Sequence, residues 1–160
     1  MEDKFAHIID QIRQRILSVE GTLSLQVQAL YVFGSFDTMH FHTESDIDLG
    51  ILADRTLTAP DKMEIIKALD LPGGHVMDLV DLRAVDLEMQ DIVISERRRI
   101  YTAAEAIEDV EDYEHYVWVM YLTLCEDRKE IIDRIKKTGV IYGPDYIEKG
   151  RIRKSMRKTH

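Results

Sequence analysis

The chain contains 160 residues, 45% of them hydrophobic and 32% charged, so a single domain with a sizeable core is expected. A formal net charge of −9 at pH 7 disfavours direct binding to nucleic acid, because like charges repel. The one cysteine excludes an internal disulfide. The lack of a basic-then-apolar leader or a membrane-length apolar run predicts a cytoplasmic protein with no membrane contact.

Hydrophobic periodicity predicts helices and strands in alternation along the chain. A first amphipathic helix is expected to end just before Gly21, and the region 91–102 is ambiguous between helix and strand. The predicted elements are a helix at 3–19, strands at 27–33 and 46–53, a helix at 59–69, a strand at 75–82, a helix beginning at 84–89, and a long helix at 103–137 with apolar residues every seven positions (Val110, Val117, Leu124 and Ile131).

The run GSFDTMHFHTESDIDLG is the most informative part of the chain, because ten residues separate Gly34-Ser35 from Asp46-x-Asp48. Glycine at a strand end lets the backbone approach a phosphate closely, and a serine hydroxyl and unpaired N–H groups can bind its oxygens. Asp46 and Asp48 project to one side of a strand while Ile47 turns into the core. Two adjacent carboxylates favour a hard cation such as Mg²⁺. The pattern suggests metal-assisted nucleotidyl transfer.

Other interpretations of this run fail on chemistry. An EF-hand loop beginning at Asp46 would have Leu57 where a bidentate Glu is required, and its glycine falls one position early. A Walker A loop is excluded because the chain has no Gly-Lys-Ser/Thr. His40-x-His42 has no Cys or third His at a spacing suited to zinc.

The Gly-Ser pair and the Asp-x-Asp motif, with the residues SDIDLGIL around the aspartates, resemble the pattern of the nucleotidyltransferase fold shared with DNA polymerase β and kanamycin nucleotidyltransferase. The small size of the chain makes it most similar to the minimal nucleotidyltransferases (MNT), the antitoxin halves of prokaryotic HEPN–MNT toxin–antitoxin modules. The resemblance is specific over residues 26–82. It implies an α/β fold with a small mixed sheet flanked by helices, a short closing strand ending at Ile100-Tyr101, and a site at the ends of strands two and three. Residues 1–142 would form the nucleotidyltransferase domain and residues 143–160 a basic C-terminal tail.

The fold requires a third carboxylate on a neighbouring strand, and the run HVMDLVDL offers Asp78 and Asp81. Residues three apart on a regular strand face opposite sides, so only one of them can join the pair. Asp78 lies inside the apolar run, where a carboxylate needs a partner such as a metal, and its D-L-V context matches the family pattern. Asp81 lies at the end of the run, where a cap or turn role is favoured. Asp78 is therefore the preferred third carboxylate.

The resemblance also implies a role for each site residue. Gly34 and Ser35 would hold the β- and γ-phosphates of ATP, Asp46 and Asp48 would bridge two Mg²⁺ ions, and Asp78 would ligate the metal next to the incoming hydroxyl. The implied reaction transfers AMP to a tyrosine of a cognate HEPN RNase toxin, in a hetero-oligomeric complex. Two alternatives remain open: an antitoxin that acts by binding and occlusion without catalysis, and a nucleotidyltransferase for small molecules.

Basic residues are distributed in a way that bears on both substrate and partner. Many relatives carry an arginine in the loop after Gly-Ser, whereas this loop offers none. Arg97-Arg98-Arg99 could supply the missing basic group or form a solvated bend, and the bend is favoured. Residues 149–160 hold six basic side chains and no acid, which leaves the other 148 residues with a formal charge of −15. That acidic body would suit a basic partner; the tail is either a solvated end or a binding arm.

Overall fold

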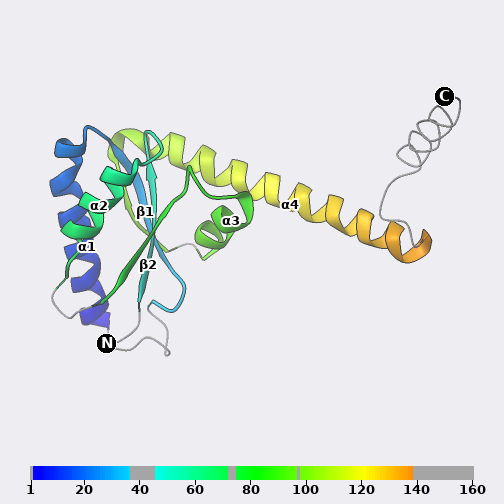
Figure 1. Cartoon of the computed structure of the whole chain (residues 1–160), viewed down its shortest axis with the longest axis horizontal. Coiled ribbons are helices and arrows are strands. Elements are labelled where there is room, and N and C mark those ends of the chain that lie inside the picture. Colours follow the sequence, from blue (N-terminus) through cyan, green and yellow to red (C-terminus); the bar gives the residue numbers. More distant parts are fainter. Residues whose placement is uncertain (1, 37–45, 72–74, 97, 139–160) are drawn as a thin grey trace, which may run out of the picture. The chain divides into compact units, whose positions relative to one another are not determined.

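The computed structural model describes residues 2–36, 46–71, 75–96 and 98–138 of the chain (Figure 1). The chain divides into two compact units, residues 1–121 and residues 122–160. The first unit contains a four-stranded sheet and the helices packed on it. The basic tail and the loop that carries His40 and His42 lie outside the described residues.

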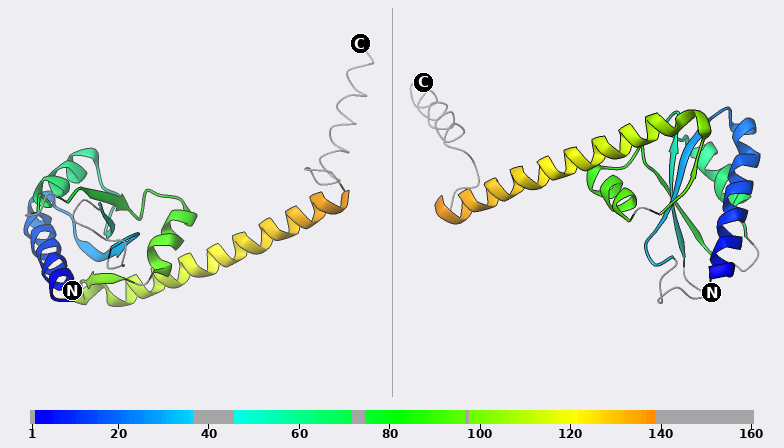
Figure 2. Two further views of the ribbon diagram at one scale, coloured as in Figure 1. Left: turned by 90° about the horizontal axis from the view of Figure 1, so that it is seen from below. Right: turned by 180° about the vertical axis from the view of Figure 1, so that it is seen from behind.

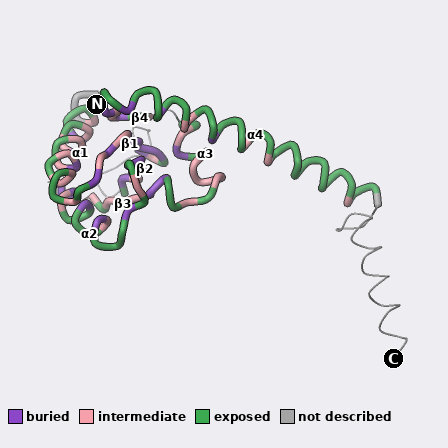
Figure 3. The backbone as a smooth tube through the Cα atoms, turned by 90° about the horizontal axis from the view of Figure 1, so that it is seen from above, coloured by how far each residue is buried: buried purple, intermediate pink, exposed green. Residues whose placement is uncertain are grey.

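The sheet has the strand order β3-β2-β1-β4 and is mixed. The central strands β1 (Val27–Phe33) and β2 (Ile47–Ala53) pair antiparallel, β4 (Arg99–Thr102) runs antiparallel to β1, and β3 (Met77–Asp81) runs parallel to β2. Both central strands are almost fully buried, as their apolar runs indicate, and Figure 3 shows buried positions concentrated in the strands. The predicted α/β class with a small mixed sheet is confirmed.

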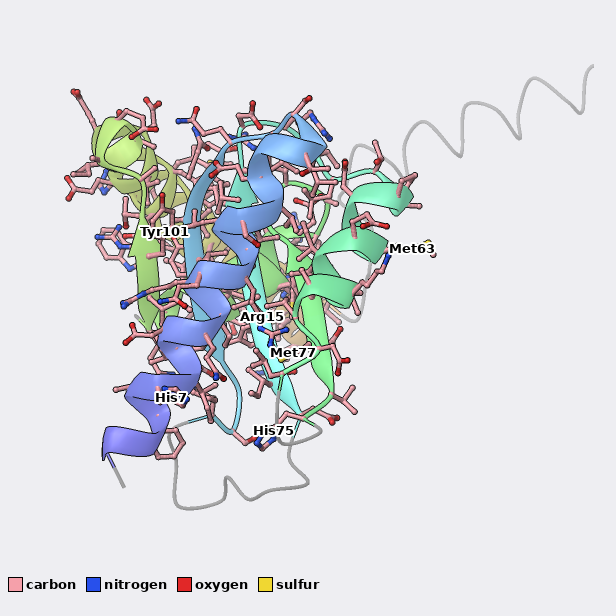
Figure 4. The ribbon with its side chains drawn as sticks, turned by 90° about the vertical axis from the view of Figure 1, so that its left-hand side faces the viewer. His7, Arg15, Met63, His75, Met77 and Tyr101 are labelled. Atoms are coloured by element: carbon pink, nitrogen blue, oxygen red, sulfur yellow. The ribbon has the colours of Figure 1, made fainter. Side chains whose placement is uncertain are left out.

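One face of the sheet packs against α1 (Glu2–Leu23) and α2 (Ala59–Ala68), which lie together on the same side in Figure 2. The apolar stripe of α1 buries Ile8, Ile12 and Ile16 against alternate residues of β1 and β2. Arg15 reaches from α1 to the end of α2, where its guanidinium donates to the carbonyl oxygens of Ala68 and Asp70 (Figure 4). These contacts fix the two helices to each other and to the sheet.

The opposite face packs against α3 (Leu87–Ser95), the short 3₁₀ turn η1 (Ala104–Ala106) and the start of α4 (Ile107–Thr138). Val93 of α3 and Val110 of α4 are fully buried there. The Tyr31 hydroxyl donates to Glu114 of α4 at 2.8 Å, and burial raises the pKa of this phenol far above its ordinary value. The Tyr113 hydroxyl donates towards the carbonyl oxygen of Leu82 at 3.1 Å, and burial raises its pKa to about 12.

The first helix is longer than the sequence predicts. It continues through Gly21 and ends at Leu23, because Leu23 still packs against the core while Gly21 lies on the exposed side. Ser24 takes the left-handed conformation (φ 49°) after the helix. The Leu25 N–H donates to the carbonyl oxygen of Glu20 at 3.5 Å, which is the hydrogen bond of a Schellman cap.

The ambiguous region 91–102 divides between a helix and a strand. Residues 91–95 complete α3, whose N-cap is Asp86, so this helix begins slightly later than the sequence suggests. Residues 99–102 form the short closing strand β4, which contains the expected Ile100-Tyr101 pair. The third predicted strand is also shorter than expected, since β3 begins at Met77 rather than His75.

The second unit is described over residues 122–138, which continue α4. Most of these positions are exposed, including Leu122, Ile131 and Ile132. The long helix was predicted, but the seven-residue repeat is buried only at its first two members, Val110 and Val117. Over the described residues, no helix combines the length and the apolar character that a membrane crossing requires.

Candidate active site

The two aspartates of the Asp-x-Asp motif lie at the beginning of β2. Ile47 is completely buried in the core on the α1–α2 side, so Asp48 must project from the other face of the sheet. In the parallel pairing with β3, Asp48 is the register partner of Asp78; on its other side, across the antiparallel pairing, it faces Phe33. The candidate site therefore lies where β2 and β3 begin and β1 ends.

Gly34 follows β1 directly and brings the backbone against the Asp48 carboxylate. Its φ of +70° belongs to the left-handed region that side chains disfavour. A Cβ atom built at this position would lie 2.2 Å from Oδ2 of Asp48, so any larger residue would have to displace that carboxylate. The backbone conformation therefore favours glycine here, and a larger residue would also move the Asp48 carboxylate. Ser35 is the next residue of the same turn and is partly exposed.

The carboxylates of this site repel one another. The pKa of Asp48 is raised above its ordinary value, first by burial and then by the negative charges of Asp78, Asp46 and Glu96. Asp46 and Asp78 are exposed, whereas Asp48 is partly buried between them. A cation placed here would relieve the repulsion that the free protein carries.

This set of ligands fits Mg²⁺ by its chemistry, because it offers hard carboxylate oxygens beside a turn suited to phosphate. Among the described side chains, no three His, Cys, Asp or Glu groups are already gathered around a metal position. Mg²⁺ does not require such a cage, since it usually takes one or two carboxylates together with substrate phosphates and water. The arrangement of Asp46, Asp48 and Asp78 is compatible with that mode of binding.

Asp81 has a different environment from Asp78. The residue is only 2% exposed, and its carboxylate accepts hydrogen bonds from the backbone N–H groups of Leu57 at 2.8 Å and Arg83 at 3.0 Å. These bonds join the end of β3 to the segment before α2. Asp81 thus holds a buried turn, as expected for a residue at the end of the apolar run.

Two further residues contact the glycine turn from the segment between α3 and β4. The Gly34 N–H donates to Oε2 of Glu96 at 3.0 Å. The Arg98 guanidinium donates to the carbonyl oxygen of Gly34 at 2.8 Å, to that of Phe36, and to the same Glu96 carboxylate. Sequence reasoning did not single out Glu96, because nothing in the local pattern shows that it approaches a turn 62 residues away.

The favoured interpretation of the arginine triplet as a solvated bend is wrong for its described members. The Arg98 side chain is 24% exposed and bound to the glycine turn. Arg99 begins β4 and forms an ion pair with Glu114 at 3.1 Å. Arg97 and the arginine-free loop at 37–45 lie outside the described residues.

A separate cleft of about 510 Å³ opens between α3, β4 and α4. It is lined by Asp91, Ile94, Ser95, Arg99, Glu111, Glu114, His115 and Trp118. None of the five residues predicted for the site lines this cleft. Among the described residues, the candidate active site is formed instead by the glycine turn and the carboxylates at the ends of β1, β2 and β3.

Comparison with known proteins places the chain in a family. Residues 19–106 match the family described as polymerase beta, nucleotidyltransferase. That match covers more than half of the chain, so the protein belongs to this nucleotidyltransferase family. The match includes the glycine turn and all three carboxylates of the site.

The proteins similar to this chain include a protein adenylyltransferase and chains of toxin–antitoxin structures. The chain is 29% identical over 110 residues to protein adenylyltransferase MntA of Shewanella oneidensis, covering 69% of this chain and 77% of that protein. It matches a chain of a toxin–antitoxin crystal structure with AMP-PNP at 24% identity and a TM-score of 0.58, covering 77% of this chain and 97% of that one. It also matches a chain of the structure of a tri-AMPylated Shewanella oneidensis HEPN toxin in complex with MNT antitoxin, at 24% identity and a TM-score of 0.53, covering 78% of this chain and 98% of that one. The predicted similarity to MNT antitoxins is confirmed, and the two structures establish the shared fold.

Proposed function

We propose that this protein is an antitoxin that transfers AMP from ATP to a tyrosine of a cognate HEPN RNase toxin, with Mg²⁺ as cofactor, in the cytoplasm. The observation that carries the proposal is the meeting of Gly34, Asp48 and Asp78 at one edge of the sheet, in a chain 29% identical to a protein adenylyltransferase. A toxin is the proposed partner because the two solved structures compared above are toxin–antitoxin complexes.

Each residue of the site has a proposed role. Gly34 and Ser35 bind the β- and γ-phosphates through backbone N–H groups and the serine hydroxyl. Asp46, Asp48 and Asp78 would hold Mg²⁺, with Asp78 nearest the acceptor hydroxyl. The register pairing of Asp48 with Asp78, and the engagement of Asp81 with two backbone N–H groups elsewhere, support Asp78 as the third carboxylate. Bound Mg²⁺ supplies charge neutralisation for the phosphates and lowers the pKa of the acceptor hydroxyl.

The reaction is a substitution at the α-phosphorus of ATP. The tyrosine oxygen forms a bond to the α-phosphorus, and the bond from that phosphorus to the bridging oxygen of pyrophosphate breaks. The phenolic proton leaves towards the carboxylate of Asp78 and then to solvent. Tyrosine suits this role because its hydroxyl loses a proton near pH ~10, well below an aliphatic alcohol. The products are AMP-tyrosine and pyrophosphate.

The acceptor is expected to arrive on another macromolecule. Over the described residues, the cleft between α3 and α4 does not include the carboxylates of the candidate site. Positioning of the tyrosine in line with the α-phosphate must therefore come from surfaces of the toxin docked outside the site. The acidic body of the chain suits a basic partner surface.

Intact-mass spectrometry of the toxin after incubation with this protein, Mg²⁺ and ATP tests the proposal. We expect additions of about 329 Da, the AMP increment, on a toxin tyrosine, and none with Asp46→Asn or Asp48→Asn. A control with an ATP analogue that carries a methylene group between the α- and β-phosphorus atoms, which cannot donate AMP, separates transfer from binding. A toxin that is inhibited but unmodified would show that the protein acts by occlusion, and full transfer by both Asn variants would overturn the metal assignment.

A further inference from the structure

One carboxylate oxygen beside the candidate active site receives two donors of the kind that bind phosphate. Oε2 of Glu96 accepts from the Gly34 N–H at 3.0 Å and from the Arg98 guanidinium, with which it also forms an ion pair. The donors come from distant parts of the chain, one from the turn after β1 and the other from the segment before β4. Together they form an anion-binding position that an internal carboxylate fills.

This position adjoins the metal-binding edge. Gly34 lies so close to Asp48 that an added Cβ would be 2.2 Å from its carboxylate. A guanidinium and a backbone N–H converging on one oxygen are the donors that a phosphate oxygen prefers. The Glu96 carboxylate therefore stands where an oxygen of a phosphate chain held by Gly34 would lie.

We propose that Glu96 occupies the triphosphate position in the nucleotide-free protein, and that Arg98 is the cation that the triphosphate takes over on displacing Glu96. The inference rests on the proposed function, since it assumes that Gly34 binds phosphate. It identifies the arginine that the loop after Gly-Ser does not supply. That arginine, Arg98, comes from the segment between α3 and β4, and the Glu96 carboxylate pairs with it until nucleotide binds.

The attachments of the two side chains fit such an exchange. Glu96 is the C-cap residue of α3 with a side chain 33% exposed, so rotation about its own bonds moves the carboxylate into solvent. Arg98 is less exposed, at 24%, and also donates to the carbonyl oxygens of Gly34 and Phe36. Those carbonyls keep the guanidinium beside the turn when Glu96 leaves. A triphosphate, with more negative charge than one carboxylate, then competes for it.

The simplest rival explanation gives both residues a bracing role only. If Glu96 and Arg98 did nothing but hold the turn, removing either would loosen Gly34 and weaken nucleotide binding. The exchange predicts effects of opposite sign on the affinity for ATP. Removing the Glu96 carboxylate frees the two donors and should strengthen binding, whereas removing the Arg98 guanidinium takes away one donor and should weaken it. The signs of the two effects therefore distinguish the explanations.

The experiment is calorimetric titration of ATP into the full-length protein, with Mg²⁺ and again in EDTA. For Glu96→Gln we expect about tenfold tighter binding of ATP in both conditions. This corresponds to a binding free energy more favourable by about 1.4 kcal/mol, because the glutamate carboxylate no longer competes with the triphosphate. For Arg98→Met we expect binding at least tenfold weaker, with partial recovery in Arg98→Lys, which keeps the charge but not the planar fork. Glu108→Gln makes the same charge change at an exposed position on the first turn of α4 and should leave the affinity unchanged.

The possible outcomes are separable. Weaker or unchanged ATP binding by a folded Glu96→Gln overturns the exchange, whatever the activity of the wild-type protein. ATP binding and AMP transfer by the wild type, with no effect of Glu96→Gln, leave the proposed function standing and reject this inference. If neither the wild type nor Glu96→Gln binds ATP, the proposed function and the inference both fail. Unfolding temperatures of all variants show whether an effect comes from the site or from the fold.

Discussion

Asp78 and Asp81, three residues apart on β3, are expected to respond in opposite ways to the same conservative substitution. Replacing either by asparagine removes one negative charge and changes the shape of the side chain very little. We expect Asp81→Asn to destabilise the fold while the folded protein still transfers AMP. We expect Asp78→Asn to keep its stability and lose transfer.

The magnitude for Asp81 follows from its hydrogen bonds. Oδ2 accepts from the Leu57 N–H and Oδ1 from the Arg83 N–H, and the residue is 2% exposed. An asparagine has one carbonyl oxygen, so its NH₂ group would face one of these donors and leave a backbone N–H unpaired. A hydrogen bond to a charged group contributes roughly 1.5–3 kcal/mol, so we expect a loss of about 2 kcal/mol. For a domain of this size, that loss lowers the unfolding temperature by roughly 4–8 °C.

Asp78 has no such role in stability. It is exposed, and its charge raises the pKa of Asp48, so Asp78→Asn should change the free energy of unfolding by no more than about 0.5 kcal/mol. Differential scanning calorimetry in EDTA measures stability, and intact-mass analysis of the toxin measures transfer at a temperature where both variants are folded. Equal unfolding temperatures for the two variants would refute the hydrogen-bond argument. Loss of transfer in folded Asp81→Asn, with Asp78→Asn active, would reverse the choice of third carboxylate.

Further changes test the packing, the charges and the tail. Gly50→Ala should lower the free energy of unfolding by about 1–3 kcal/mol, because its Cβ would lie 2.6 Å from Cγ1 of Val93. In denaturant titrations, the double variant Gly50→Ala/Val93→Ala should recover part of that stability. In EDTA, Asp48→Asn should raise the free energy of unfolding at pH 7, because it removes a carboxylate whose pKa is raised in the folded state. This stabilisation should disappear as the pH falls from the folded-state pKa of Asp48 to the unfolded-state pKa of ~3.9. Asp61→Asn should lower the free energy of unfolding at pH 7, because Arg55 and Thr58 lower the pKa of Asp61, and this loss should disappear below pH ~4. If the stability of the two variants changed with pH in the same direction, the opposite pKa shifts of Asp48 and Asp61 would be contradicted. If residues 149–160 bind the toxin, their deletion should weaken the complex more at low salt than at high salt, and unchanged affinity at low salt would identify a solvated end.

The local sequence was sufficient for most elements of the fold. The apolar run of β1 gave its bounds of 27–33, and the Pro-containing start of α2 was correct because Thr58 and Asp61 form a capping box there. The alternation that sends Ile47 inwards and Asp48 outwards is also a local property, since a strand repeats every two residues. These features depend on neighbours a few positions away, which the sequence displays directly.

Tertiary structure decided where helix α1 ends and which residues surround the glycine turn. The helix continues past Gly21 because Leu23 gains burial against the core, and that gain outweighs the helical cost of an exposed glycine, about 1 kcal/mol. The pairing of Asp48 with Asp78 requires β3 to lie parallel to β2 in one register, and the approach of Glu96 to Gly34 requires α3 to end beside β1. Neither contact has a local signal, because each is fixed by how the whole sheet and its helices bury their apolar faces. The sequence by itself therefore determined the two central strands and the outward side of the Asp-x-Asp motif, and packing across the sheet decided which groups face that motif.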